Sequence, residues 1–422
     1  MNRICVLGLG YIGLPTALLF ANNGAEVIGV DINKNIIETL KKGKLHFEEK
    51  GLSELLNNAQ KKKSFIASTE VVPADVFIIC APTPLDKEYY VADLDYVTLG
   101  CNMVVPYLKK NNLVVIESTI SPGSSENLFK KNLEKSGLIA GKDFHLVHCP
   151  ERAIPGNTIQ EMINNHRIVG GLTQEAAEKA KILYNKFVPL DKIHTTDIRT
   201  AEIVKLMENT FRDVNIALAN EFAMLCEELE INVWKAIELA NYHPRVNILK
   251  PGPGVGGHCI AIDAWFLAET SSNAQLIQKA RSINDFMPNF TLKLTKQLLG
   301  DTIEFPTITV LGVAYKGNVD DTRESPALKY IHLAKKESMI IKIHDPLCKQ
   351  FKGGELLPLK EAVKDSDCLV LITDHSNFKN IDPKEIGKLM RNKNLLDTRN
   401  VLDHSQWEKA GFKIKVLGNN KK

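Results

Sequence analysis

Three glycines near the N-terminus, Gly8, Gly10 and Gly13, have G-x-G-x-x-G spacing between an apolar run and a helical stretch, LPTALLFANNG. Asp31 ends the next apolar run, about 20 residues further along, which completes the dinucleotide-binding pattern. Such glycines allow a tight turn and a close backbone approach, and the helix N-terminus faces the pyrophosphate. Asp31 would accept a hydrogen bond from the adenosine 2′-hydroxyl and repel a 2′-phosphate. The pattern therefore predicts an NAD site, with a plain glycine-rich connection as the alternative.

One of the cysteines, Cys259, lies in a glycine-rich stretch, GPGVGGHCIAIDAWF, at residues 252–266. By itself a cysteine is more often a core residue than a reactive one. The glycines around this one let the backbone approach a ligand, and His258 and Asp263 supply polar groups. A thiol beside NAD can trap an aldehyde as a thiohemiacetal, which loses hydride to give a thioester that water hydrolyses. We therefore interpret Cys259 as a candidate nucleophile.

Polar residues also follow three of the apolar runs: Thr83 after FIICAP, Thr119 after VVIES and Glu151 after VHCP. In open α/β sheets, ligands bind beyond the carboxyl ends of the strands. For any one of these residues, capping of a helix or turn is an equally good interpretation. Three of them in one sheet favour a ligand site.

Residues 199–231 are predicted to form one long helix with two apolar stripes. The first stripe recurs at helical spacing in Ile203, Met207, Phe211, Val214, Leu218, Phe222 and Leu225. The opposite face carries Lys205, Asn209 and Arg212 and continues with Ile216, Ala219 and Ala223. We expect such a helix to be buried between domains or subunits. A covered lysine beside an amide suits charge stabilisation or proton transfer, with a solvated face as the alternative.

The first half of the chain predicts a doubly wound α/β fold with a parallel sheet. Its short apolar runs alternate with amphipathic stretches: RICVLGLG, EVIGVD, SFIAST, DVFIICAP, LVVIEST, FHLVHCP and HRIVGG. A second α/β pattern begins near residue 305, with TITVLGVAY, SMIIKIHDP, DCLVLITDH and NLLDTRN. Its first turn, VLGVAYKG, lacks a second glycine, so we do not expect it to bind a dinucleotide in the same way.

The composition excludes several classes of protein. A chain of 422 residues, 44% apolar and 24% charged, is typical of a soluble protein with two or three domains. The net charge of +3 and the lack of a basic stripe argue against a nucleic-acid partner. No apolar run is long enough to span a membrane, and the N-terminal run lacks a signal cleavage site. The scattered cysteines have no CxxC pair and no zinc-ligand spacing, which predicts a cytoplasmic protein with no metal.

Taken together, the motifs resemble those of the UDP-glucose/GDP-mannose dehydrogenase family over nearly the whole chain. The stretches that carry the resemblance are GLGYIGLP, CAPTP, EST, CPER, AEIVKLMENTFRDVNIALANE, GVGGHC, GVAYKGNVDDTRESPA and DTRN. The resemblance implies two Rossmann-like domains joined by a central helical region: an NAD domain at 1–198, a dimerisation region with the catalytic loop at 199–300, and a UDP-binding domain at 301–422. It also implies a homodimer or higher homo-oligomer, and a four-electron oxidation that uses two NAD⁺ per sugar.

The resemblance assigns roles to individual residues. It implies that Cys259 is the nucleophile, that Lys205 stabilises the oxyanion with help from Asn209, and that Asp263, Thr119 and Glu151 place water or protons. For NAD it implies contacts at Gly8, Gly10, Tyr11, Ile12, Gly13, Asp31, Thr83 and Thr119. For the substrate it implies contacts at Arg152, Ala153, Lys205, Asn209, Arg212, His243, Arg245, Gly256, Tyr315, Lys316 and Arg399. The residue matching Arg245 reaches into the partner subunit's site in this family.

The stretch YHPRVNILKPGPGVGGHCIAID resembles the branch of the family that acts on N-acetylated sugars. Ile262 precedes Asp263, where the UDP-glucose branch usually has lysine, and Ala264 follows it, where the N-acetyl branch usually has proline. The implied reaction is oxidation of UDP-N-acetyl-D-mannosamine at C6 to the uronate. UDP-N-acetylglucosamine and UDP-glucose are the alternative substrates.

Two other kinds of protein share parts of this pattern. A two-electron dehydrogenase of the 3-hydroxyacid type also has an NAD domain followed by a long helix, but it needs no thiol. A nucleotide-sugar sensor without catalysis would need none of Lys205, Asn209, Cys259 and Asp263. The three possibilities differ in the NADH released per sugar, which would be two, one or none.

Cofactor choice is predicted to depend on Asp31. Replacing it with serine should weaken the preference for NAD, since a charged hydrogen bond is worth about 1.5–3 kcal/mol and the repulsion of a 2′-phosphate disappears. The measurement is kcat/KM with NAD and with NADP for both proteins. Wild-type protein that uses NADP as well as NAD would contradict this interpretation.

Overall fold

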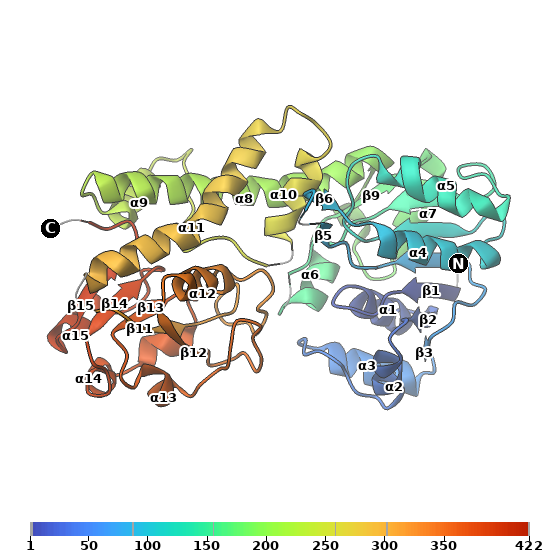
Figure 1. The fold of residues 1–422 in the computed structure, drawn as a ribbon. Coiled ribbons are helices and arrows are strands. Elements are labelled where there is room, and N and C mark those ends of the chain that lie inside the picture. The colour runs from blue at the N-terminus through green and yellow to red at the C-terminus, as the bar shows by residue number, and fades with distance from the viewer. Residues whose placement is uncertain (1–2, 87, 155, 258, 301–302, 421–422) are drawn as a thin grey trace. The chain divides into compact units, whose positions relative to one another are not determined.

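The computed structural model describes residues 3–86, 88–154, 156–257, 259–300 and 303–420 (Figure 1). His258, the polar neighbour of Cys259, lies outside these ranges. The chain divides into two compact units, one made of Met1–Glu208 with Trp265–Ser272 and the other of Asn209–Ala264 with Asn273–Lys422. Among the described helices, none is long and apolar enough to cross a membrane.

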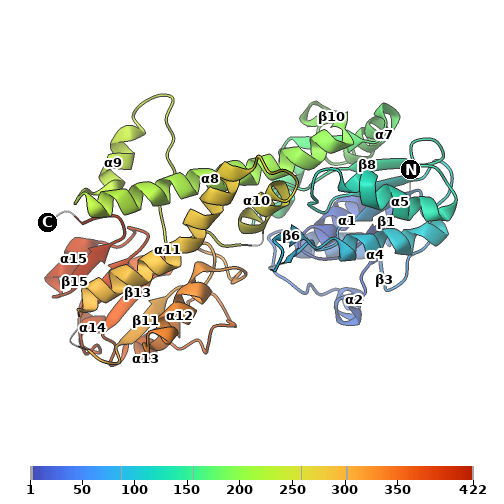
Figure 2. The same ribbon diagram turned by 45° about the horizontal axis from the view of Figure 1, so that its top comes forward.

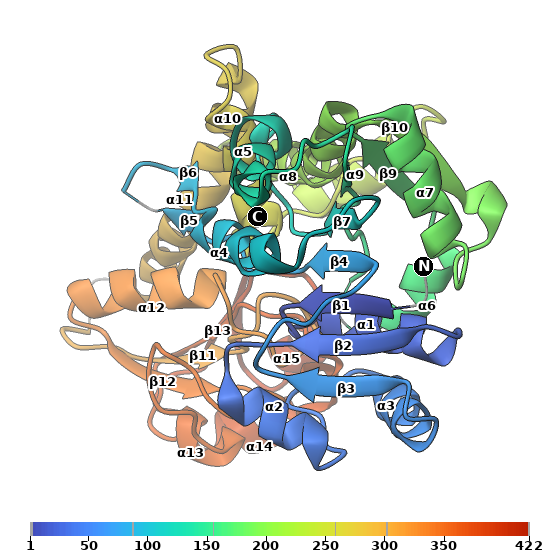
Figure 3. The ribbon, with the colours of Figure 1, turned by 90° about the vertical axis from the view of Figure 1, so that its right-hand side faces the viewer.

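The first unit is built on an eight-stranded sheet, whose strands lie side by side in Figure 3. Its order is β10-β9-β8-β7-β4-β1-β2-β3. The bounds are β1 (Arg3–Leu7), β2 (Glu26–Val30), β3 (Phe65–Ser68), β4 (Val76–Ile79), β7 (Leu113–Ile116), β8 (His145–His148), β9 (Arg167–Gly171) and β10 (Ile193–Asp197). A separate hairpin pairs β5 (Leu85–Asp86) with β6 (Val91–Ala92). The stretch from β3 to β8 is parallel, which confirms the predicted doubly wound fold.

Helices cover both faces of this sheet. On one face α1 (Gly13–Asn22), α2 (Lys34–Lys41), α3 (Leu52–Lys61), α6 (Thr158–Asn164) and α7 (Gln174–Tyr184) share a core with the strands. On the other face lie α4 (Asp95–Val104) and α5 (Lys130–Leu133). The central strands are buried along their whole length, as VFII and LVVI show, because helices cover the sheet from both sides.

The last two strands of this sheet differ from the sequence prediction. HRIVGG forms β9, but β9 runs antiparallel to β8, and β10, which the apolar runs did not predict, is parallel to β9. In the β8–β9 register Val147 pairs with Gly171 and His148 with Gly170, so continuing the ladder brings Arg167 opposite Glu151. These two side chains form an ion pair of 2.6 Å, which favours the antiparallel arrangement.

The second unit contains a parallel five-stranded sheet in the order β12-β11-β13-β14-β15. Its strands are β11 (Thr307–Leu311), β12 (Ile340–His344), β13 (Cys368–Leu371), β14 (Asn394–Asp397) and β15 (Lys413–Val416). One face packs against α11 (Gln275–Leu299) and α12 (Pro326–Lys336), the other against α13 (Leu359–Val363), α14 (Pro383–Gly387) and α15 (His404–Lys409) (Figure 1). The strand β15 was not among the predicted runs.

The long helix α8 (Ile198–Glu228) is continuous, as Figure 2 shows, and α9 (Val233–Ala240) follows it. One of its predicted apolar stripes is exposed in the single chain, with Met207 at 56% and Phe211 at 71% of full exposure. Ala219 and Ala223, on the other stripe, are buried. Lys205 is buried too, whereas Arg212 is exposed, so the polar face is covered only in part.

Candidate active site

The glycine-rich turn after β1 has two glycines that the protein itself requires and one that faces open space. A Cβ on Gly8, where φ is +89°, would lie 2.5 Å from the Cys80 carbonyl oxygen, and one on Gly13 would lie 1.8 Å from the Gly8 oxygen. A Cβ on Gly10 would meet no heavy atom of the described residues within 4 Å. The turn therefore fits NAD, because the middle glycine is the one at which the backbone approaches a pyrophosphate.

Asp31 links this turn to the next helix. Its Oδ2 accepts from the Leu9 N–H at 2.9 Å and its Oδ1 from the Asn33 N–H at 2.8 Å. A carboxylate has about four lone-pair sites, so acceptors remain for the hydroxyl groups of a ribose. Tyr11 is exposed, with its ring centroid 4.4 Å from that of Phe47. Ile12, which immediately precedes α1, is partly buried against the core.

The predicted polar residues at the strand ends lie on neighbouring turns. Thr83 is buried on the turn after β4, and Thr119 is half-buried on the turn after β7. The Ser118 hydroxyl donates to the Ala81 carbonyl at 2.7 Å, which ties these two turns together. The structure thus brings Thr83 and Thr119 to one edge of the sheet, near the end of β1.

The side chain of Glu151, which is 7% exposed, lies in a cluster that the sequence motifs did not predict. Its Oε2 is 2.6 Å from Nη2 of Arg167, and Nη1 of Arg167 is 3.5 Å from Oε1 of Glu117. Burial alone would raise the pKa of Glu151. The Arg167 charge and the N–H groups of Arg152 and Ala153 hold that pKa below its ordinary value. Each of the apolar runs VVIEST and HRIVGG contains one charged residue, Glu117 or Arg167. A charged residue within an apolar run was the feature of the sequence that could have identified this cluster.

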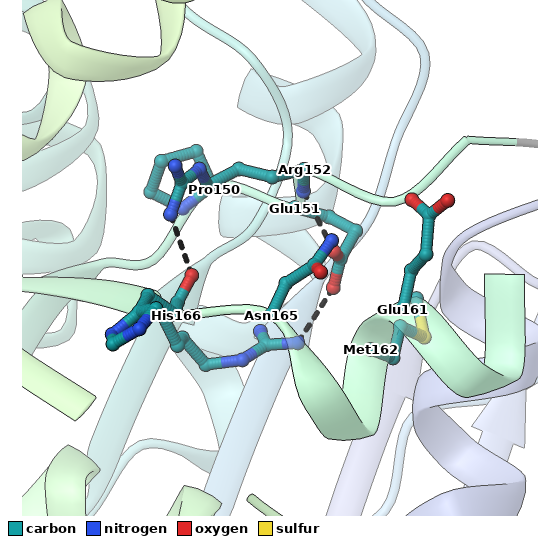
Figure 4. Close-up of a pocket in the computed structure, with 8 residues that line it drawn as sticks. Pro150, Glu151, Arg152, Glu161, Met162, Asn165 and His166 are labelled. Carbon is teal, nitrogen blue, oxygen red and sulfur yellow. Dashed lines mark hydrogen bonds and ion pairs between the residues drawn. The ribbon is translucent and has the colours of Figure 1, made fainter. Parts of the chain in front are cut away.

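The side chain of Arg152 is engaged within the first unit. Its Nε donates to Oε2 of Glu208 on α8 at 2.9 Å, its Nη2 pairs with the other oxygen of Glu208, and its Nη1 donates to the His166 carbonyl at 2.5 Å. The Ala153 N–H donates to Oε1 of Glu151 at 2.8 Å. Figure 4 shows Arg152 and Glu151 lining a pocket with His166 and Asn165. A substrate contact by Arg152 would therefore compete with Glu208.

Two predicted catalytic residues of the second unit are in direct contact. Nδ2 of Asn209 donates to Oδ2 of Asp263 at 2.5 Å, and Asp263 is buried. The exposed Cys259 immediately precedes α10 (Ile260–Ala268), and its carbonyl accepts from the N–H groups of Ile262 and Asp263. A helix N-terminus stabilises negative charge, so the place of Cys259 suits a thiolate. Lys205 lies one turn before Asn209 in α8.

The glycines before Cys259 allow the loop to pack closely against other parts of the second unit. A Cβ on Gly252 would lie 2.6 Å from Nη1 of Arg399, and one on Gly256 would lie 2.5 Å from the Glu324 carbonyl oxygen. Gly257 has φ of +88° and packs against the Tyr315 ring. That these glycines also let the backbone approach a ligand stays a prediction. In the described structure they let it approach protein atoms, because the loop packs against the turns after β11 and β14.

A buried polar network, also missed by the sequence analysis, anchors the same loop. Asn220 accepts from the Gly252 N–H at 2.8 Å and donates to Asn284 at 2.9 Å, and Asn284 donates to Asp213 at 2.8 Å. Nη1 of Arg281, on α11, is 2.6 Å from Oδ1 of Asp213. Single polar residues in helical stretches resemble a solvated face, so no local signal pointed to this network.

The predicted substrate residues of the second unit fall into two sets. Tyr315 and Arg399 are half-buried near the glycine loop. Burial, and then the nearby Asp321 and Cys259, raise the pKa of the Tyr315 phenol, while Arg212 lowers it, so these groups share one electrostatic environment. The exposed set comprises Lys316 on the turn after β11, Arg212 on α8, and His243 and Arg245 in the turn after α9.

Buried Asp345 and His375 hold the turn that carries Tyr315 and Lys316. Asp345 accepts from the Val313 N–H at 2.7 Å and from Nε2 of His375 at 3.1 Å. Nδ1 of His375 accepts from the Asn318 N–H at 3.0 Å, so the ring proton is on Nε2. Burial opposes ionisation of Asp345, but these donors hold its pKa well below the usual range.

The chain matches three family models along its length. These are the NAD binding domain of the UDP-glucose/GDP-mannose dehydrogenase family at residues 2–188, its central domain at 199–286 and its UDP binding domain at 309–404. Within the described residues, no group of three or more His, Cys, Asp or Glu side chains is arranged to hold a metal ion.

Individual relatives match over nearly the whole chain. The UDP-N-acetyl-D-mannosamine dehydrogenase of Methanococcus vannielii is 48% identical, covering 99% of this chain and 97% of its own. The solved structure of UDP-D-ManNAc dehydrogenase from Pyrococcus horikoshii has a TM-score of 0.93 at 41% identity, covering 100% of both chains. A UDP-glucose dehydrogenase structure from Pyrobaculum islandicum has a TM-score of 0.86 at 25% identity, covering 99% of this chain and 96% of that one.

The glycine turn allows a matched pair of substitutions. Gly10→Ala should leave the free energy of unfolding almost unchanged but weaken NAD binding, because the methyl group occupies the side on which the pyrophosphate approaches. Gly13→Ala should destabilise the fold, because its Cβ would overlap the Gly8 carbonyl. Urea unfolding and NAD titration of both variants check this. Undiminished NAD affinity in Gly10→Ala would contradict the placement.

Proposed function

Because the chain belongs to the UDP-glucose/GDP-mannose dehydrogenase family, we propose that it oxidises UDP-N-acetyl-D-mannosamine at C6 to the uronate. It is an NAD-dependent nucleotide-sugar dehydrogenase, and its glycine turn fits that cofactor. The observation that carries the proposal is the contact between Asn209 and Asp263 beside the helix that follows Cys259. A half-buried amide bound to a buried carboxylate, on the helix that begins just after an exposed thiol, suits a reaction with a covalent intermediate.

The chemistry on this chain would run in two oxidations. Bound NAD supplies the hydride acceptor in each. In the first oxidation the C6 alcohol becomes an aldehyde, and Lys205 stabilises the oxygen as its negative charge develops. Cys259 then adds to the aldehyde to form a thiohemiacetal, which loses hydride to become a thioester. Asp263 and Thr119 place the water that hydrolyses the thioester.

Asn209 would act on both Lys205 and Asp263. It lies one turn after Lys205, so its amide can share in binding the oxyanion. One N–H of its Nδ2 already donates to Asp263, and the second N–H of the same amide is the donor that would bind the oxyanion. Holding both partners in place costs no rearrangement when charge develops in the transition state.

The UDP moiety would bind to the second unit. Lys316 and Arg399 supply cationic donors suited to phosphate oxygens, and Nε of Arg399 is already oriented by the Ile372 carbonyl at 2.9 Å. Tyr315 and the backbone of Gly256 adjoin them. His243, Arg245 and Arg212 would complete the substrate contacts, with Arg152 and Ala153 from the first unit. These assignments follow the family resemblance of each residue.

We further propose the division into an NAD domain at 1–198, a dimerisation region at 199–300 and a UDP-binding domain at 301–422. The three matched family ranges support it. The cytoplasmic location expected from the scattered cysteines stays a prediction.

A homodimer through α8 is also part of the proposal. In the part of α8 within the second unit, Phe211, Leu218 and Leu225 are exposed and recur every seven residues, which gives a continuous apolar stripe. Phe211→Glu should convert the dimer to a monomer in light scattering, while Ile182→Glu, at an equally exposed apolar site on α7, should not. A monomeric wild-type protein would rule out the dimer.

Counting NADH tests the reaction and the substrate together. UDP-N-acetyl-D-mannosamine should yield two NADH per sugar, and its kcat/KM should exceed those of UDP-N-acetylglucosamine and UDP-glucose. UDP-N-acetyl-D-mannosamine and UDP-N-acetylglucosamine differ only in the orientation of the C2 acetamido group. A site that hydrogen-bonds this group in one orientation discriminates strongly between the two sugars. If either alternative sugar were better by more than about tenfold, equal to about 1.4 kcal/mol, we would abandon the epimer assignment.

Cys259→Ser is the variant matched to this assay. An alcohol cannot readily form and release the acyl intermediate, so steady-state NADH production should be lost. Binding of the UDP-sugar, measured by calorimetry, should persist because the Asn209–Asp263 contact remains. Full NADH production by this variant would exclude covalent catalysis.

A further inference from the structure

A chain of buried hydrogen bonds connects the loop before Cys259 to α8 and α11. Oδ1 of Asn220 accepts from the Gly252 N–H at 2.8 Å, and its Nδ2 donates to Oδ1 of Asn284 at 2.9 Å. Nδ2 of Asn284 donates to Oδ1 of Asp213 at 2.8 Å. We call Gly252, Asn220, Asn284 and Asp213 the Asn220 chain. Asn220 and Asp213 are 0% exposed and Asn284 is 1% exposed, so bulk water does not replace a bond that is lost here.

The two ends of the Asn220 chain fix the direction of each bond in it. A backbone N–H only donates, so Gly252 requires the oxygen of the Asn220 amide. Both the carboxylate and the carbonyl of Asp213 accept from Asn284, so they require its amide nitrogen. Each of the two amides therefore has a single orientation that satisfies both of its partners.

A buried cation lies at the far end of the chain. Nη1 of Arg281 is 2.6 Å from Oδ1 of Asp213, and Nη2 is 2.5 Å from Oδ1 of Asp285. Burial raises the pKa of Asp213, and the Arg281 charge opposes that rise. The pair with Arg281 therefore favours the ionised carboxylate, which has no proton to donate and holds the Asn284 nitrogen toward itself.

The near end of the chain lies beside residues predicted to bind the substrate. A Cβ on Gly252 would lie 2.6 Å from Nη1 of Arg399, and Gly257 packs against the Tyr315 ring. The Gly257 N–H donates to the Arg323 carbonyl at 3.1 Å. Loop 252–257 is thus held at both ends, and Cys259 follows it two residues later.

We propose that Asn220 and Asp213 are positioning residues for the reaction at Cys259. Asn220 holds loop 252–257 so that the thiol and the residues expected to bind the UDP moiety keep a fixed separation. Asp213, through Asn284, keeps the Asn220 amide in the orientation that Gly252 requires. The inference rests on the proposed function for its kinetic tests, whereas the fixing of the loop can be measured without turnover.

Two substitutions of similar volume separate hydrogen bonding from packing. In Asn220→Asp a protonated carboxyl presents one oxygen to Gly252 and one hydroxyl donor to Asn284, as the amide does, whereas an ionised carboxyl has no donor. Asn220→Leu has neither group at any pH, and its kcat/KM should be below that of wild type by roughly tenfold to a hundredfold. The kcat/KM of Asn220→Asp should approach that of wild type at low pH and fall toward that of Asn220→Leu as the carboxyl ionises.

The charged groups around position 220 act on the introduced carboxyl. They are Asp213 on α8, Arg281 and Asp285 on α11, and Arg399 on the turn after β14. Burial and the two aspartates should raise the pKa of this carboxyl, and the two arginines should lower it. All four groups are present in both variants, so the ratio of kcat/KM to wild type at each pH reports the new side chain. Equal ratios for Asn220→Asp and Asn220→Leu at every pH, or wild-type kinetics in Asn220→Leu, would overturn the proposal.

The NADH released per sugar identifies the step that depends on the loop. The first oxidation converts the C6 alcohol to an aldehyde without the thiol, whereas the second requires Cys259 on that aldehyde. Asn220→Leu should therefore give fewer than two NADH per sugar, and hydroxylamine should trap the released aldehyde as an oxime. Asp213→Asn/Arg281→Met leaves the direction of the chain open, so it should show a smaller defect of the same kind. Wild-type rate and stoichiometry in this double variant would contradict the role of Asp213.

Hydrogen exchange of the amides in 252–257 tests the fixing of the loop. These amides should exchange faster in Asn220→Leu than in wild type. Asn112→Leu is the matched control, because Asn112 is a buried asparagine just before β7 whose amide accepts from the Lys109 N–H at 2.6 Å and donates to the Ala74 carbonyl at 3.0 Å. Asn112→Leu should lower the stability to urea but leave kcat and the exchange in 252–257 unchanged.

Unchanged exchange in Asn220→Leu would refute the inference, as would an equal acceleration in Asn112→Leu. If Asn220→Leu does not fold, Asn220→Ser replaces it, because a serine hydroxyl is too short to reach both Gly252 and Asn284. Wild-type protein that makes no NADH from any UDP-sugar would instead refute the proposed function, and the exchange measurement would still decide whether Asn220 holds the loop.

Discussion

Carboxylates that accept backbone N–H groups hold the turns of both units in place. A turn after a strand leaves amide groups with no partner in the sheet, and a buried amide without a partner costs as much as a lost hydrogen bond. An ionised carboxylate can satisfy two or more of them with strong hydrogen bonds. The turns held in this way include those expected to bind both ligands: Asp31 binds Leu9 and Asn33, Glu151 binds Arg152 and Ala153, Asp345 binds Val313 and Ala314, and Asp397 binds Arg399 and Asn400.

Both sheets have an aspartate directly after their second strand, but the two carboxylates have different roles. Asp31 and Asp345 each follow the second strand of their sheet in sequence, and each accepts from the turn after the first strand. Asp31 keeps acceptors available on a partly exposed carboxylate. Asp345 is buried and bound to His375, so it cannot receive a ribose. The first turn of the second sheet is thereby held rigid and presents Tyr315 and Lys316.

Buried charged side chains occur close to the turns that carry predicted site residues. In the first unit Arg167 pairs with Glu117 and Glu151, and in the second unit Arg281 pairs with Asp213. Each arginine has almost no exposed surface. Breaking such a pair by removing one partner is far costlier than never having formed it. Both pairs lie next to segments that carry predicted site residues, which restricts those segments to one arrangement.

Local sequence determined much of this protein. The spacing of Gly8, Gly10 and Gly13 with Asp31 predicted the NAD turn, and alternating apolar runs predicted two α/β units and a long helix, because these signals repeat over a few residues. Only the tertiary structure decided that β9 runs antiparallel, that Arg167 meets Glu151, that Glu208 engages Arg152, and that the glycines before Cys259 pack against Arg399 and Tyr315. Each of these is a contact between residues distant in sequence, and whether a charge is solvated or buried depends on which partner the fold brings to it.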